Sequence, residues 1–291
     1  MLDRPALIVP FTKMNGAGND FVVLDNRFMH FSDDELAAFA RRLCPRRTGV
    51  GADGLLALDD GAEGFDFRMR YRNADGSLGT MCGNGARCLA RFAARAGLGT
   101  GEGTVALAFE TDGGPYRATV EGRAASGPVS LAVPPHRDAA LAAIEADPAC
   151  GVEPAVLGIW TGTEHAVVFA PDVDAADVAT EGARLRNAET FAPAGTNVDF
   201  VEVTGPDRIR VRTFEKGVEA ETLACGTGAI ASALAAHLSG RLAGDGRQSV
   251  AVEMPGGTLT VGFLADGDAV SDLTLAGPAE TVYEGTVEWR G

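Results

Sequence analysis

The sequence lacks long apolar segments: across its 291 residues, no run approaches the roughly 18 to 20 apolar residues that a membrane-spanning helix needs. The opening segment, MLDRPALIVPF, lacks both the basic start and the small-residue cleavage site of a secretion signal. These two absences predict a cytoplasmic protein that neither binds nor crosses a membrane.

Basic residues are also scarce, with 25 Lys and Arg against 40 Asp and Glu, which gives a formal net charge of −15. Such a charge repels nucleic-acid phosphates and anionic membrane surfaces. We therefore expect no nucleic-acid partner. We interpret the acidity as a solvated surface, which says little about the substrate.

Cysteine and histidine are too few and too scattered for a disulfide framework or a zinc site. The five cysteines are an odd number at no repeating spacing: Cys44, Cys82, Cys88, Cys150 and Cys225. Without a secretion signal they predict reduced thiols. The four histidines form no close pair with a cysteine at zinc-site spacing, so no metal is expected.

The glycine-rich segments do not match a nucleotide-binding motif. GLGTGEG at 97–103 follows a predicted helix and precedes a predicted strand, whereas a dinucleotide fingerprint needs a strand, then glycines, then a helix. GVGADG at 49–54 has no Walker lysine and serine. The sequence therefore predicts no nucleotide cofactor.

The sequence does contain 46% hydrophobic residues and 38 glycines, typical of a soluble globular protein with many turns. Its length predicts two domains. Ser32 and Glu35 form a capping-box pattern before a helix that extends to about residue 44. Segments rich in β-branched and aromatic residues predict strands at 21–26, 67–73, 104–111, 116–122, 127–134, 164–170, 198–204, 208–215, 249–263 and 281–289.

Two matching stretches, MCGNGARC at 81–88 and LACGTGAI at 223–230, each place Cys-Gly before an apolar helix that ends at a glycine, Gly97 or Gly240. The motif recurs after about half the chain, which indicates an internal duplication. We predict an α+β fold with two pseudo-symmetric domains, each a curved mixed sheet or barrel around a central helix. The predicted halves are 1–126 and 127–277, and the final strand, 278–291, belongs to the second half or returns to the first.

A cysteine at a helix N-terminus lies where backbone amides and the helix dipole stabilise a thiolate, so its pKa is expected below the usual value of about 8.5. The amides at the two helix starts, from Gly83, Asn84, Gly226 and Thr227, are suited to hold a carboxylate. One such motif alone is typical of a helix cap with a buried thiol. Two equivalent copies favour a pair that removes a proton from one face of a carbon and delivers a proton to the other.

Five motifs in order, KMNGAGNDFVVLDN, GVGADG, NADGSLGTMCGNGARC, GTNVDF and FEKGVEAETLACGTGA, make the sequence resemble the diaminopimelate epimerases over nearly its whole length. These are cofactor-independent racemases and epimerases with two cysteines. The resemblance implies a diaminopimelate epimerase-like fold, a homodimer, and no pyridoxal phosphate. It implies conversion of LL-2,6-diaminopimelate to meso-diaminopimelate in lysine and peptidoglycan precursor biosynthesis.

The resemblance also implies roles for individual residues. It implies that Cys82 and Cys225 are the two acid/base groups and that His165 and Glu215 take part in catalysis. The residues that it implies for substrate binding are Asn19, Asn73, Gly83, Asn84, Thr163, Asn197, Glu215, Lys216, Gly226 and Thr227. Asparagine amides and a carboxylate suit a substrate with two zwitterionic ends.

Among the departures of the sequence from the family pattern, two fall at substrate-binding positions. The usual Gly-Asn-Pro-His is GTEH here, so Thr163 and Glu164 replace an asparagine and a proline. The usual Glu-Arg is Glu215-Lys216, which puts an ammonium where a planar guanidinium would grip a carboxylate. These departures concern recognition of the distal end of the substrate.

Three alternatives stay open from the sequence. The same fold could act on proline, hydroxyproline or another amino acid. Cys82 and Cys225 could form a reversible disulfide in a redox protein, although the chain has no Cys-X-X-Cys motif. The chain could also bind an amino acid without catalysis, although binding alone does not require two thiols.

Overall fold

The structure is a computed structural model that describes residues 7–289. The first six residues of the opening segment considered above, and the last two of 278–291, lie outside this range. The chain divides into two compact units: the first extends to Leu131 and continues from Gly277, and the second is Ala132–Ala276. Among the helices of residues 7–289, none is both long and apolar enough to cross a membrane.

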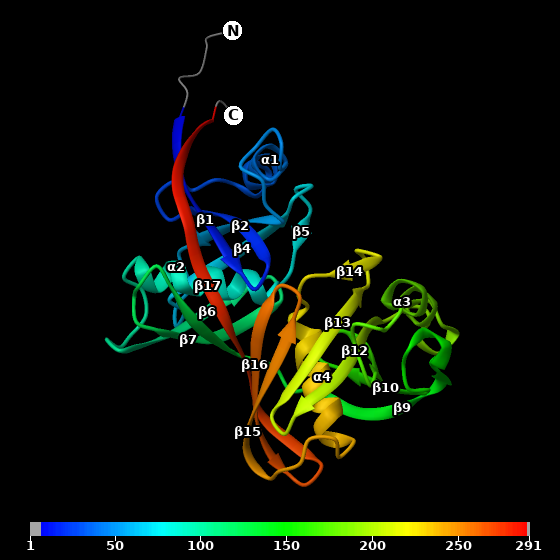
Figure 1. Ribbon diagram of the computed structural model, residues 1–291. Helices are drawn as coiled ribbons and strands as arrows, with labels where there is room; N and C mark the ends of the chain where they lie inside the picture. Colours follow the sequence, from blue (N-terminus) through cyan, green and yellow to red (C-terminus); the bar gives the residue numbers. More distant parts are fainter. Residues whose placement is uncertain (1–6, 290–291) are drawn as a thin grey trace. The chain divides into compact units, whose positions relative to one another are not determined.

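The first unit is a mixed sheet with two helices (Figure 1). Antiparallel pairs join β1 to β2, β3 to β4, β4 to β5 and β6 to β7, while β2 with β3 and β4 with β6 are parallel. Its elements are β1 (Leu7–Gly16), β2 (Asn19–Asp25), α1 (Asp33–Leu43), β3 (Gly54–Asp59), β4 (Phe67–Asn73), β5 (Leu78–Gly79), α2 (Gly83–Arg95), β6 (Thr104–Thr111), β7 (Gly114–Glu121) and β8 (Ser126–Ala132).

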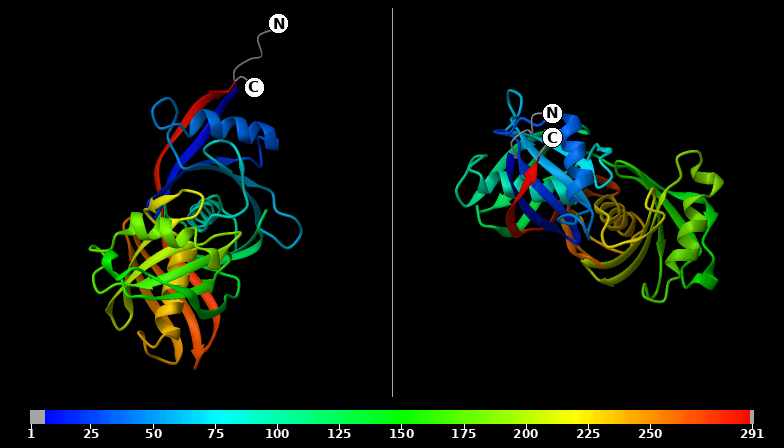
Figure 2. Two further views of the ribbon diagram at one scale, coloured as in Figure 1. Left: turned by 90° about the vertical axis from the view of Figure 1, so that its right-hand side faces the viewer. Right: turned by 90° about the horizontal axis from the view of Figure 1, so that it is seen from above.

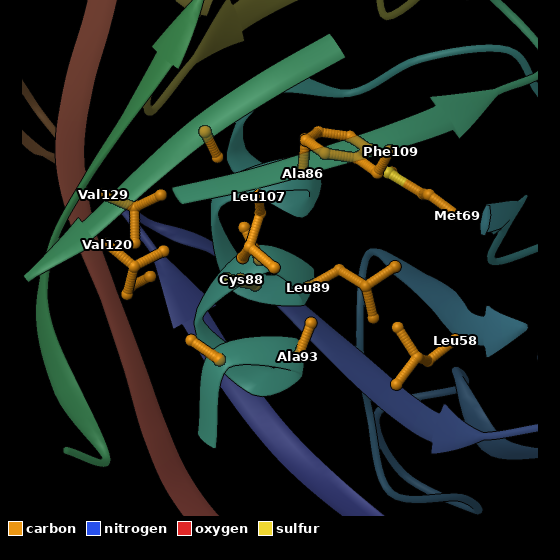
Figure 3. Packing of buried hydrophobic residues seen from close by; sticks show 14 of the residues in the cluster. Leu58, Met69, Ala86, Cys88, Leu89, Ala93, Leu107, Phe109, Val120 and Val129 are labelled. Atoms are coloured by element: carbon orange, nitrogen blue, oxygen red, sulfur yellow. The ribbon is translucent and has the colours of Figure 1, made fainter. Parts of the chain in front are cut away.

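Strands β2 and β3 are buried on both faces because a helix covers each face. Alternate residues of a strand point to opposite sides of the sheet. Val22, Leu24, Leu55 and Ala57 pack in the core that contains α1, whereas Phe21, Val23, Leu56 and Leu58 pack in the core that contains α2. Figure 3 shows the second core, where Cys88, Leu89 and Ala93 of α2 lie among side chains of the surrounding strands.

The second unit repeats this order of elements. Strands β10 to β13 pair as β1 to β4 do, including one parallel pair, β11 with β12, and a second parallel pair joins β13 to β15 as β4 joins β6. Its elements are β9 (Arg137–Glu145), a 3-10 turn at Pro148–Cys150, β10 (Ala155–Trp160), β11 (Glu164–Phe169), α3 (Val178–Arg186), a 3-10 turn at Glu189–Phe191, β12 (Asn197–Gly205), β13 (Arg208–Glu215), β14 (Ala220–Thr222), α4 (Gly226–Leu238), β15 (Gly246–Met254) and β16 (Gly257–Asp266).

The two units therefore share one plan, in which the second helix lies inside the curve of the sheet. In Figure 2 the left view looks along α2 (cyan) and the right view looks along α4 (gold). Strands of the same unit surround each helix. Within residues 7–289 the strands include a closed barrel of eight, with further strands outside it, and four helices make the fold mixed α+β. This confirms the predicted fold class.

The last strand, β17 (Ala269–Trp289), contributes to both units. Its first part pairs with β16, and its last part pairs antiparallel with β1, from Leu7 opposite Trp289 to Asn15 opposite Glu280. The Trp289 ring stacks on Phe39 of α1 with 3.8 Å between ring centroids, and Ala279 is buried in the core around α2. The final strand thus completes the packing of the first unit.

The predicted helices are confirmed. Ser32 and Glu35 form the capping box of α1, and Gly97 and Gly240 follow α2 and α4 with φ of 92° and 74°. The sequence analysis did not predict the strands at 7–16, 54–59, 78–79, 137–145, 155–160 and 220–222, nor the helix at 178–186.

Candidate active site

Cys82 and Cys225 occupy the same position in the two units. Each is the N-cap residue of the enclosed helix and has an extended backbone, with φ and ψ of −141° and 116° for Cys82 and −121° and 112° for Cys225. Both are reduced thiols; Cys82 is half-buried and Cys225 is buried. The first amides of a helix have no partner within the helix, so each thiol lies beside donors suited to an anion.

The surroundings of Cys225 contradict one sequence-based expectation. Burial raises the pKa of the Cys225 thiol, and the nearby carboxylates of Glu215 and Asp199 raise it further. The expected lowering of its pKa by the helix N-terminus is therefore wrong for this cysteine, because desolvation and negative charge outweigh the helix amides. Cys225 Sγ lies 3.4 Å from Thr227 Oγ1, and the Thr227 carbonyl accepts a 3.0 Å hydrogen bond from Thr161.

Strand alternation explains why the predicted polar residues of the second unit converge. Ala166, Val168, Val198, Phe200 and Phe214 belong to the core that contains α3. The alternate residues of β11, β12 and β13 must then point to the other face, toward α4. These residues include His165, Asn197, Asp199, Thr213 and Glu215.

Asp199 is the centre of this group, with none of its surface exposed. Its carboxylate accepts hydrogen bonds from His165 Nδ1 at 2.7 Å and from Thr213 Oγ1 at 2.7 Å. Because a carboxylate only accepts, His165 carries a proton on Nδ1 and its other nitrogen, Nε2, is left for a different partner. Asn197 Nδ2 lies 3.5 Å from that Nε2.

Asn197 and Glu215 extend the group. The Asn197 side chain donates to the Glu164 carbonyl at 3.1 Å and accepts from the Lys216 amide at 2.9 Å, which holds its orientation. Burial raises the pKa of the Glu215 carboxyl, and the charge of Asp199 adds to this effect. Glu215 and Cys225 thus share the same cause of a raised pKa, which is burial beside the Asp199 carboxylate.

The two departures from the family pattern contact each other. Lys216 Nζ donates to Glu164 Oε2 at 2.9 Å, and Thr163 Oγ1 donates to the same oxygen at 3.3 Å. The Lys216 bond holds the pKa of Glu164 below its usual range. The ammonium of Lys216 is thus shared with a protein carboxylate.

The first unit brings together two of its three predicted asparagines. Asn84 is buried in the first turn of α2, and its Nδ2 donates to Asn19 Oδ1 at 2.5 Å. Asn19 in turn donates to Asp53 Oδ2 at 3.0 Å. The predicted site residue Gly83 precedes Asn84 at the start of the same helix.

Asn73 is not part of this hydrogen-bonded chain. It ends β4, opposite Gly54 of β3, and its Nδ2 donates to Ser77 Oγ at 2.9 Å. Glu215 ends β13, the corresponding strand of the second unit. The two residues therefore lie at equivalent places in the repeated plan.

The structure adds polar residues that the sequence analysis missed. Asp53, Arg87 and Asp199 each contact a predicted site residue, and Thr213 in turn contacts Asp199. Asp53, Asp199 and Thr213 have partners distant in sequence, whereas the partner of Arg87 is three residues away. Three of the four lie inside motifs already noted: Asp53 in GVGADG, Arg87 in MCGNGARC and Asp199 in GTNVDF.

Solved structures place the whole chain in one fold. The phenazine biosynthesis protein of the PhzF family from Bacillus anthracis aligns with a TM-score of 0.73 at 16% identity, covering 97% of this chain and 99% of that one. A hydroxyproline epimerase from Agrobacterium vitis aligns with a TM-score of 0.65 at 18% identity, covering 97% and 91%. At these identities the likeness defines the fold.

Sequence comparison then defines the family. The sequence profile of diaminopimelate epimerase matches residues 11–131 and 158–282. A diaminopimelate epimerase of Chlorobaculum tepidum is 40% identical over 284 residues, which cover 94% of this chain and 99% of the relative. The chain belongs to the diaminopimelate epimerase family.

Proposed function

We propose that this chain is an isomerase that converts LL-2,6-diaminopimelate to meso-diaminopimelate with no cofactor, using Cys82 and Cys225 as the two acid/base groups. The observation that carries the proposal is the repeated position of the thiols. Each caps the enclosed helix of one of two units with the same plan, in a chain of this family. Binding alone does not require that repetition.

The proton transfers balance without an oxidant or a metal. One cysteine, as thiolate, takes the proton from the α-carbon, and the electron pair of the C–H bond stays on the substrate and spreads onto its carboxylate. The other cysteine, as thiol, gives its proton to the opposite face of the same carbon. The two sulfurs end with exchanged protonation states.

The remaining predicted residues have roles in this scheme. The helix-start amides of Gly83, Asn84, Gly226 and Thr227 stabilise the charge on the reacting carboxylate. The side chains of Asn19, Asn73, Asn197, Thr163 and Lys216 bind the polar groups of the substrate. His165 and Glu215 support catalysis, and Glu215 also receives a substrate ammonium.

The proposal also covers the cellular compartment, the oligomeric state and the biosynthetic role of the protein. We place the protein in the cytoplasm as a homodimer, in the synthesis of lysine and peptidoglycan precursors. Its partner is a small molecule, and the expected activity needs neither pyridoxal phosphate nor a metal.

The test is turnover of LL-diaminopimelate in deuterium oxide with separation of the stereoisomers. Product should gain deuterium at once, because the delivering thiol has exchanged with solvent. Recovered substrate should stay mostly unlabelled at low conversion. Cys82→Ala and Cys225→Ala should each abolish epimerisation.

Two results would contradict the proposal. One is early deuterium in recovered substrate equal to that in product. The other is activity that depends on added pyridoxal phosphate or metal. Faster turnover of proline or hydroxyproline would instead support the alternative substrate class.

A further inference from the structure

Arg87 is a buried cation without a carboxylate partner. It lies on α2 and has none of its surface exposed. Its Nη2 donates to Asn84 Oδ1 at 2.5 Å, while its Nε and Nη1 have no hydrogen-bond partner within residues 7–289. An unpaired charge is unfavourable in such a place, and burial lowers the pKa of Arg87 accordingly.

Two thiols, Cys88 and Cys82, have the opposite effect on Arg87: a negative charge on either one raises the pKa of the guanidinium. Cys88 is fully buried, and burial raises its pKa to about 12, so it is a neutral thiol at neutral pH. The phenols of Tyr71 and Tyr116 also pack against this core, and burial raises the pKa of Tyr116. Of these two thiols, Cys82 is the half-buried one, so its thiolate is the better candidate to compensate Arg87.

Arg87 also begins a chain of hydrogen bonds with a fixed direction. A guanidinium only donates and an ionised carboxylate only accepts. Between Arg87 and Asp53 lie the amides of Asn84 and Asn19, so each must turn its oxygen toward Arg87 and its nitrogen toward Asp53. Asp53 is held in place by Arg46 at 2.6 Å.

This chain of bonds leaves binding capacity on both amides. Each asparagine uses one N–H and one oxygen lone pair within it. A second N–H and a second lone pair remain on each, in a known orientation. Asp53 favours this direction from one end and Arg87 from the other, so turning over either amide would oppose two donors or two acceptors.

We propose that Arg87 is a positioning residue of the Cys82 site, which orients Asn84 and Asn19 and supplies the positive charge that favours the thiolate of Cys82. The inference rests on the proposed roles of Cys82, Asn84 and Asn19. It adds to them a group that touches no substrate.

Arg91 provides a matched control on the same helix. It lies one turn after Arg87 and is equally buried. Its guanidinium instead donates to backbone carbonyls, of Glu121 at 2.8 Å and Pro128 at 2.9 Å. Its role is to join α2 to the strands, so its loss should affect stability more than thiol chemistry.

The first measurement is the rate of alkylation of Cys82 by iodoacetamide between pH 5 and 10, followed by mass spectrometry of the Cys82 peptide. The full-length protein needs no substrate for this assay, so the result is separable from failure of the proposed function. In the unaltered protein, the midpoint should fall below the usual thiol value of about 8.5. A midpoint above that value would overturn the proposal without any variant.

Variants then separate charge from geometry. Arg87→Gln should raise the midpoint by about one unit, which is roughly tenfold slower alkylation at pH 7. Arg87→Lys keeps the charge and should leave the midpoint near that of the unaltered protein. Arg91→Gln should also leave it unchanged, even with a lower melting temperature. A midpoint for Arg87→Gln equal to that for Arg91→Gln would overturn the charge role.

The orienting role has its own readout. Arg87→Gln and Asp53→Asn should each raise KM for LL-diaminopimelate by about fivefold or more, since each replaces a group that only donates or only accepts at one end of the bond chain. Asp53→Asn should do so without shifting Cys82 alkylation. Unchanged KM in both variants would show that the amides need no such support.

Discussion

At the scale of single residues, the two thiols differ in the charge that surrounds them. Cys225 lies near two carboxylates, Asp199 and Glu215, and its pKa is raised. Cys82 lies near Arg87, a cation. A pair of acid/base groups in opposite electrostatic surroundings is suited to opposite protonation states. Under the proposed function, Cys82 then acts as the base of the free enzyme and Cys225 as its acid.

Lys216 and Glu164 give a prediction about substrate affinity. Glu164→Gln removes the charge that holds the Lys216 ammonium, so KM for diaminopimelate should fall about two- to fivefold if Lys216 binds a substrate carboxylate. Lys216→Arg should be tolerated or lower KM, because a planar fork can serve two acceptors. Steady-state kinetics of both variants provide the measurement.

The comparison variant for this pair is Glu215→Gln. It should impair activity more strongly, because it removes a half-buried carboxylate proposed to meet a substrate ammonium. Equal and negligible effects of all three substitutions would mean that this strand end is solvated surface.

Asp20 gives a prediction about acid stability. Burial alone would raise its pKa, but hydrogen bonds from Arg46 and Lys13 outweigh burial and lower the pKa from 3.8 to about 2. A carboxyl group with a lowered folded-state pKa adds stability above its unfolded value, and that stability is lost as pH falls toward 2. Asp20→Asn should therefore reduce the unfolding free energy by about 1–2 kcal/mol at pH 7 and by little near pH 2.

Urea unfolding at several pH values between 2 and 7 measures this effect. Asp60→Asn, an exposed acidic position in the same unit, is the control and should change little at any pH. A constant difference between Asp20→Asn and the unaltered protein across the range would contradict the assignment.

At the scale of elements, the third residue after each capping cysteine is a glycine, but the two glycines have different neighbours. A Cβ at Gly228 would collide with Asp199 Oδ1, whereas a Cβ at Gly85 would meet the ends of Leu56 and Phe21 side chains at 3.1 and 3.4 Å. Flexible apolar ends can move aside, but Asp199 is fixed by His165 and Thr213.

Gly228→Ala should therefore destabilise the protein by about 2 kcal/mol or more, although alanine is normally the better helix former by about 1 kcal/mol. It should also lower epimerase activity at least tenfold, since it displaces the partner of His165. Gly85→Ala should alter stability by less than about 1 kcal/mol. Thermal unfolding and turnover of both variants test the contrast, and equal destabilisation would show that the approach of Asp199 to α4 is not tight.

Elements with a clear period or boundary signal were predictable from the sequence, and elements defined by tertiary neighbours were not. The capping box at Ser32 and the glycines after α2 and α4 fix those helices locally. Strand β9, in contrast, is rich in alanine, which favours helix, and it is extended because it pairs with β10. The thiols were recognisable because their motif repeats, whereas Arg87 reads as an ordinary helix residue until its burial is known.

At the scale of the whole molecule, the first unit depends on a strand that follows the second unit in sequence. A chain that stops after Ala276 loses the pairing of β17 with β1 and the stacking of Trp289 on Phe39. We expect the amides of α2 to lose at least about 100-fold of their hydrogen-exchange protection, since the core around that helix is opened. Amides of α4 should keep most of theirs.

Hydrogen exchange with mass spectrometry, read separately for peptides of α2 and α4, gives the measurement. Trp289→Ala in the complete chain is a milder comparison that removes the ring but keeps the strand. Full protection of α2 in the shortened chain would show that β17 is dispensable for the first unit.

Because the first unit is made of two separate segments of the chain, it can be completed only late in protein synthesis. The 145 residues of Ala132–Ala276 are translated between its two parts. At about 5–20 residues per second, synthesis of this segment takes roughly 7–30 s, so β17 becomes available to pair with β1 only after that delay. During that interval one edge of β1 has no strand beside it, and open edges are templates for aggregation. We expect ribosome-bound chains to become protease-resistant across residues 7–131 only after residues 277–289 have emerged from the exit tunnel.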